Sequence, residues 1–123
     1  MSQFFRIFKT RRGIECAVQS TFANVAASQT DSALVAAKAG KRIAVMSVAF
    51  VAGGTATNAT FNSKPSGAGA AISMTFANAA NGGAVLGHNP HAWFVTKTGE
   101  GLSLTTGAGS TTGVQVVYAY VDP

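Results

Sequence analysis

Residues 42–52 read RIAVMSVAFVA, and this stretch decides the fold. Successive side chains of an extended strand point to opposite faces of a sheet. In this stretch both alternating sets are apolar, with Ile43 and Val45 in one set and Met46 and Val48 in the other. Strands that are apolar on both faces are typical of the centre of a sheet that is covered on both sides. We therefore expect residues 42–52 to form a central, doubly covered strand.

Shorter strand-like segments lie around this stretch, separated by turns rich in Gly, Asn and Thr. Residues 32–39 are interpreted as a strand or a single turn, which Gly40 ends. β-prone composition or alternation predicts the further strands 55–63, 71–77, 92–96, 102–105 and 114–121. The alternation predicts inward positions for Ile72, Met74, Phe76, Leu102 and Leu104, and one shared face for Val114, Val116, Tyr118 and Tyr120.

The number and spacing of these segments predict the fold class. They amount to about seven or eight short strands with turns about every 8–12 residues, which is the spacing of a β-sandwich or jelly roll. We therefore expect an all-β antiparallel sandwich or jelly roll. Residues 14–123 would form the β-sandwich domain, and residues 1–13 an extended N-terminal arm. Small residues are abundant, and chains with such thin cores often complete their burial against another subunit.

The composition limits the class of protein. The chain has 123 residues, which is enough for one domain. Hydrophobic residues make up 47% and charged residues 11%, a balance that excludes a disordered chain. The single cysteine, Cys16, excludes an intramolecular disulfide. No uninterrupted apolar stretch is long enough for a membrane span, so we expect none.

The N-terminal arm combines aromatic and basic side chains. It carries most of the net charge of +5, and the rest of the chain is close to neutral. A folded nucleic-acid-binding domain would be expected to carry a basic face of its own, so this distribution argues against nucleic-acid binding. A docking arm fits better, since aromatic side chains anchor in apolar pockets and cations meet an acidic surface. The residues expected to bind the partner are Phe4, Phe5, Arg6, Phe8, Lys9, Arg11 and Arg12.

The titratable residues form no recognisable catalytic or metal-binding motif. His88 and His91 are the only histidines, and Pro90 prevents a helix that would place both rings on one face. A metal would need a third ligand, and no cysteine or acid lies close in sequence. No G-x-S-x-G nucleophile motif occurs, and the glycine-rich residues 107–113 contain no lysine and lead into a strand. We therefore expect no enzyme activity, no cofactor and no bound metal.

Three aromatic residues are candidates for an oligomer interface: Trp93, Tyr118 and Tyr120. Trp93 and Phe94 are adjacent, so one of them would face the core and the other would face outward. An outward Trp93 would mark an interface, because large aromatic side chains are enriched in interface cores. An inward Trp93 would simply be part of the core, and both readings stay open.

Four stretches carry a family resemblance. They are residues 40–47 (GKRIAVMS), 80–83 (ANGG), 93–104 (WFVTKTGEGLSL) and 113–121 (GVQVVYAYV). Through them, residues 38–121 resemble small β-sandwich virion proteins of tailed bacteriophages, of the head-decoration or capsid-stabilising kind. The resemblance implies a jelly-roll-like sandwich, oligomers that are often trimers on the capsid exterior, and no enzymatic role. The arm matches no part of this family pattern.

A capsid decoration protein, also called an auxiliary or cement protein, is therefore the expected function. It would bind the major capsid protein and itself, as a homotrimer, and would stabilise the assembled phage head. It would lie on the capsid surface of the virion after assembly in the host cytoplasm. Two alternatives stay open. One is a tail- or fibre-associated module that binds a host glycan through residues 88–91 and 107–113; the other is nucleic-acid binding through the arm, with an affinity that falls steeply with salt.

Overall fold

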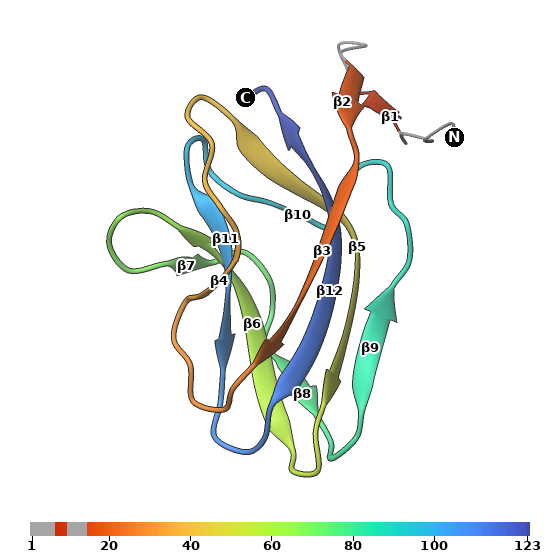
Figure 1. Ribbon diagram of the computed structural model, residues 1–123, viewed down its shortest axis with the longest axis vertical. Helices are drawn as coiled ribbons and strands as arrows, with labels where there is room; N and C mark the ends of the chain where they lie inside the picture. The colour runs from red at the N-terminus through yellow and green to blue at the C-terminus, as the bar shows by residue number, and fades with distance from the viewer. Residues whose placement is uncertain (1–6, 10–14) are drawn as a thin grey trace, which may run out of the picture.

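The computed structural model describes residues 7–9 and 15–123, and all regular elements in these ranges are β-strands (Figure 1). This confirms the predicted all-β class. No helix in the described part of the chain is long and apolar enough to cross a membrane. The strands are β1 (Ile7–Lys9), β2 (Glu15–Ala17), β3 (Gln19–Val25), β4 (Ser32–Val35), β5 (Arg42–Ala52), β6 (Thr57–Lys64), β7 (Ala70–Ala71), β8 (Phe76–Asn78), β9 (Gly83–Leu86), β10 (Phe94–Val95), β11 (Gly101–Thr106) and β12 (Thr112–Val121).

Two five-stranded antiparallel sheets pack face to face, as expected for a β-sandwich. Sheet I has the order β10-β5-β12-β3, and β9 also pairs with β5. Sheet II has the order β4-β11-β6-β7, and β8 also pairs with β6. A separate hairpin of β1 and β2 lies at the end of the sandwich where the C-terminus also lies (Figure 1). The expected count of seven or eight strands is not confirmed, because the described residues form twelve strands. Several of these are only two or three residues long.

The core between the two sheets is built around a cluster of phenylalanines. Phe61 of sheet II is fully buried. Its ring stacks on Phe94 of sheet I, with centroids 5.2 Å apart, and meets Phe50 edge-on at 6.1 Å. Phe76 lies 4.7 Å from Phe50 and so joins both sheets. Offset and edge-on contacts of this kind stabilise the core beyond the apolar area that they bury.

A β-bulge interrupts the pairing of β5 with β12. Tyr118 pairs with Val45, but Val117 pairs with Ser47, so Met46 has no partner on β12. An extra residue in one strand reverses which side of the sheet the following residues face.

The bulge explains why both alternating sets of residues 42–52 are apolar. Before the bulge Val45 faces the core between the sheets, and after it Val48 and Phe50 do. Ala44 and Met46 are buried on the outer side of sheet I, in a second cluster that Cys16 and other partly buried residues cover. The prediction of a central strand is confirmed, since β5 has β12 on one side and β9 and β10 on the other. Double coverage holds only for its first half.

The outer side of sheet II is covered through a polar network centred on Asp31. The carboxylate of Asp31 accepts hydrogen bonds from the Asn62 side-chain amide at 3.1 Å, the Ser103 hydroxyl at 3.1 Å and the Gly69 backbone N–H at 2.9 Å. This network is the reason why Ser103 is buried between Leu102 and Leu104. It ties the β6–β7 connection and the start of β4 onto the middle of the sheet.

The prediction for residues 71–77 was partly wrong. These residues are not one strand, because β7 ends at Ala71 and β8 begins at Phe76. Phe76 is buried and Ile72 packs against the core as expected, but Met74 is 71% exposed. The irregular stretch between the two strands breaks the alternation that would have turned Met74 inward. The inward positions of Leu102 and Leu104 are confirmed, as are those of Val114, Val116 and Tyr118, with Tyr120 partly buried beside them.

Replacing Phe61→Ala should lower the free energy of unfolding by about 3–5 kcal/mol, since it opens a cavity at the contact between the sheets. Urea denaturation in dilute solution, followed by tryptophan fluorescence, measures this. Phe22→Ala is the matched control. It makes the same chemical change at a side chain that is 76% exposed, and should alter the unfolding free energy by no more than about 0.5 kcal/mol. Equal effects of the two substitutions would contradict this description of the core.

Candidate docking site

The outer side of sheet I is open beyond the bulge, and it forms a candidate site that spans four strands. Four strands contribute to it, namely β3, β12, β5 and β9, and their register arranges the outward side chains in rows across the sheet. From β3 toward β9 the rows are Ser20–Val117–Ser47, Phe22–Gln115–Ala49–Val85 and Asn24–Gly113–Val51–Gly83. We call these eleven residues the open face.

Large apolar side chains of the open face are exposed to solvent. Phe22 on β3 is 76% exposed, Val85 on β9 is 77% exposed, and Val51 on β5 is 49% exposed. Single exposed apolar residues are common on protein surfaces, but these three lie on adjoining rows of one sheet around a common hollow. Such patches mark interaction surfaces in soluble proteins.

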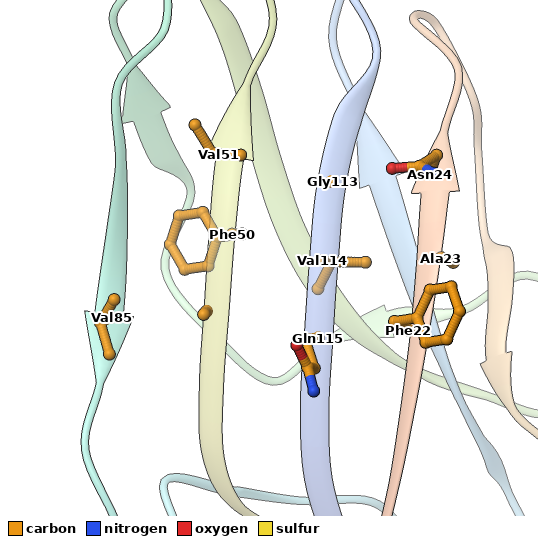
Figure 2. A pocket seen from close by; sticks show the side chains of 10 residues that line it. Phe22, Ala23, Asn24, Phe50, Val51, Val85, Gly113, Val114 and Gln115 are labelled. Atoms are coloured by element: carbon orange, nitrogen blue, oxygen red, sulfur yellow. The ribbon is translucent and has the colours of Figure 1, made fainter.

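The open face is hollow in its middle. Phe22 and Val85 stand on opposite sides of a hollow of about 360 Å³ (Figure 2). Its floor is low because Ala49 and Gly113 have small side chains or none. A second hollow of about 310 Å³ shares Val85 and Ala49 with the first and continues toward His88.

The backbone of β9 lies unusually close to β5 at Gly83. A Cβ atom built on Gly83 would lie 1.9 Å from the Phe50 carbonyl oxygen and 2.7 Å from the Val51 Cα. Only glycine permits this approach. Gly83 therefore sets where β9 pairs with β5, and through this pairing it sets the position of Val85.

None of the eleven residues of the open face is charged. Charged residues of the described chain lie elsewhere; for example, Lys41 and Asp122 form an ion pair that raises the Lys41 pKa. Depletion of charge is typical of the buried centre of protein–protein interfaces. The open face also offers no group for acid–base catalysis or for binding a metal. In residues 7–9 and 15–123 no three His, Cys, Asp or Glu side chains are grouped so that they could hold a metal ion.

The predicted docking arm lies mostly outside the described residues. This applies to Phe4, Phe5, Arg6, Arg11 and Arg12. Phe8 and Lys9 belong to β1, where the backbone pairs with Cys16 and Glu15 of β2. The roles of all seven arm residues stay predictions.

The three aromatic residues predicted for an oligomer interface do not form one surface. Tyr118 is only 8% exposed and belongs to the core. Tyr120 is half-buried beside it, and its hydroxyl donates to the Ala36 carbonyl at 2.7 Å. Trp93 is 44% exposed at the other edge of β5, where its backbone N–H donates to the Val45 carbonyl. Of the two interpretations of Trp93, the outward-facing one is therefore confirmed, while Tyr118 packs in the core of the subunit.

The two loops of the glycan-binding alternative are far apart. The backbone N–H of Asn89 donates to the Met46 carbonyl, near the bulge. The glycine-rich loop joins the opposite end of the sandwich, where Gly107 donates to the Asn58 carbonyl and Thr111 accepts from Gly53 (Figure 1). These loops do not combine into a single binding site.

Comparison with protein-family models, with curated proteins and with solved structures finds no match to this chain.

Burial raises the pKa of Tyr118 above its ordinary value of 10.0, and the neighbouring Tyr120 adds to the effect. A tyrosine with a raised pKa in the folded state stays protonated at pH values where the unfolded chain has already lost that proton. The unfolding free energy should therefore fall as the pH rises through and above about 10. Lys41, whose pKa is also raised, contributes in the same direction.

Tyr118→Phe should make this alkaline loss of stability shallower, because it removes the tyrosine contribution and leaves that of Lys41. The measurement is urea denaturation at a series of pH values from neutral to strongly alkaline. The substitution also removes the hydrogen bond from the Tyr118 hydroxyl to Gln19, which lowers the unfolding free energy where the hydroxyl is protonated, so the two proteins are compared by the slopes of their curves. An unchanged slope would show that Tyr118 titrates as in the unfolded chain.

Proposed function

We propose that this chain is a structural virion protein that decorates the head of a tailed bacteriophage. It would bind the major capsid protein and stabilise the assembled shell without catalysing a reaction. The observation that carries the proposal is the open face, a broad and uncharged surface on a rigid sandwich, with exposed apolar side chains such as Phe22 and Val85. An uncharged, partly apolar surface suits lasting contact with another protein. The family resemblance indicates that this protein is part of a phage capsid.

The proposal includes a jelly-roll fold, which the strand order supports. From β3 to β6 the chain alternates between sheets I and II with each strand. β7 and β8 then stay in sheet II, β9 and β10 return to sheet I, β11 lies in sheet II and β12 in sheet I. Two sheets connected in this alternating way, with Greek-key crossings, are typical of the jelly rolls found in viral capsid proteins and lectins.

The arm and the open face would make different contacts on the capsid. The arm would attach to the shell, with Phe4, Phe5 and Phe8 in apolar pockets and its cations against an acidic surface. The open face would join copies of the chain or bring them against the shell. Binding that selects the assembled state stabilises that state by mass action, so added contacts between capsomers would resist the pressure of packaged DNA. The homotrimer implied by the resemblance stays a prediction.

Deleting residues 1–13 should leave the sandwich folded but weaken its attachment to phage shells, because β2 to β12 keep all their partners except β1. A full-length variant with Arg6, Lys9, Arg11 and Arg12 changed to Gln should weaken attachment in the same direction. Co-sedimentation with purified shells that lack the protein measures binding, and circular dichroism checks the fold.

The matched control changes Lys38, Lys64 and Lys97 to Gln, which removes positive charge from the domain and leaves the arm intact. It should bind shells nearly as well as the wild type. If the deletion variant binds as tightly as the full chain, the arm has no role in attachment. If the full chain does not sediment with any shell, the proposed function is wrong.

A further inference from the structure

We propose that the open face binds the open face of a second copy of this chain, around a two-fold axis that runs parallel to the strands between β5 and β12. This rests on the proposed function and names the surface that joins two copies; it replaces the homotrimer implied by the resemblance with a two-fold pair. It requires no shell, so it can be tested separately from capsid binding.

The four-strand order gives the open face a centre between β12 and β5, with β3 and β9 at equal strand spacings on either side. A two-fold rotation about a strand-parallel axis at this centre turns one sheet over onto the other. It places β3 of one copy opposite β9 of its partner, and β12 of one copy opposite β5. Sheets that face each other in this nearly aligned way pack about 10 Å apart.

The same rotation brings large side chains opposite small ones. In the row that contains Val51, it places this side chain opposite Gly113 of the second copy and Asn24 opposite Gly83. In the middle row, Gln115 is placed opposite Ala49. Side chains of one sheet can therefore enter the spaces of the other, as in the interior of a β-sandwich.

The residues at the two ends of the middle row, Phe22 and Val85, are also complementary under this rotation. Phe22 of each copy is placed opposite Val85 of the other, so the two most exposed apolar side chains of the open face cover each other twice. A residue pair repeated in this reciprocal way defines an isologous interface. The two Gln115 side chains lie on either side of the axis, and an amide offers both a donor and an acceptor to its symmetry mate.

Charge selects a second copy over an acidic or basic partner. Copies of a chain with a net charge of +5 repel one another, and this repulsion is weakest where they meet through uncharged surfaces. The open face has no charged side chain, so it neither attracts an acidic surface nor repels another open face. Like charges that face each other in an interface destabilise it, and this arrangement avoids such pairs.

The size of the open face sets the expected strength of the pair. Four strands spaced about 4.8 Å apart and five residues long cover roughly 330 Å² of flat sheet. With side chains, two such faces would bury about 1,000 Å² in total, which is near the lower limit for a specific interface. We therefore expect a reversible dimer in solution, which a high local concentration on a particle would favour.

Sedimentation-velocity ultracentrifugation of the purified full chain over a concentration series measures the mass of the species. The wild type should shift from one chain to two as the concentration rises. A mass of one chain throughout would overturn the proposal, which would leave the open face to a capsid protein or another partner. A mass of three chains would also overturn it, because a two-fold contact does not close a trimer.

Charged substitutions at the opposed edges test the axis itself. Phe22→Lys and Val85→Glu should each raise the dissociation constant by about tenfold or more, since each buries an unpaired charge. The double variant with both substitutions should restore dimerisation, because each new cation then faces a new anion across the axis. The two positions lie three strands apart within one chain, so they cannot form this pair internally.

The single Val85→Glu variant distinguishes the proposed geometry from an effect of overall charge. Val85→Glu lowers the net positive charge and would favour association if overall repulsion controlled it, whereas the proposed geometry requires it to weaken the dimer. Met74→Lys is the matched control for Phe22→Lys, since Met74 is a 71% exposed apolar residue outside the open face. It should leave dimerisation unchanged. Urea denaturation confirms that each variant is folded, and failure of the double variant to recover would overturn the proposed axis.

Discussion

The antiparallel pairing of β5 with β12 is the interaction on which the rest of the structure depends. These are the two longest strands, and they lie side by side in the middle of sheet I. The bulge at Met46 divides the pair into two parts. On one side of the bulge both faces of the sheet are buried, and on the other side only the inner face is. The single unpaired residue therefore decides where the outer side of sheet I stops being covered and where the open face begins.

The outer side of sheet II is covered and most of the outer side of sheet I is not, and the chemistry of the residues explains this difference. Sheet II is covered by its own connections, which Asp31 holds through hydrogen bonds to Asn62, Ser103 and the Gly69 backbone. The open face of sheet I has no such anchor, and its exposed groups are either apolar or small. Leaving it uncovered exposes Phe22 and Val85 to water, which is unfavourable for an isolated subunit and favours association.

Residues with strong local signals could be predicted from the sequence, and residues placed by long-range pairing could not. The apolar run of β5 predicted a central strand, and the alternation of residues 114–121 predicted the strand that became β12, because both signals are local. The bulge could not be predicted, since a strand whose two alternating sets are both mainly apolar gives the same pattern with or without an extra residue. β3 was missed because its inward side chains include Thr21 and Ala23, which give weak alternation. The open face depends on the register of four strands that are distant in sequence, and no local pattern contains that information.

The separation of charge from apolar surface gives the two proposed contacts different physical characters. Attachment through the basic arm would depend on electrostatic attraction, which salt screens within about 8–10 Å at physiological ionic strength. Contact through the uncharged open face would depend on burial of apolar area, which salt does not screen in this way. A chain that kept its cations on the open face would repel its own copies wherever they met. Because the charge is concentrated at the N-terminal end, the same molecule can carry a net charge of +5 and still present a neutral surface to a second copy.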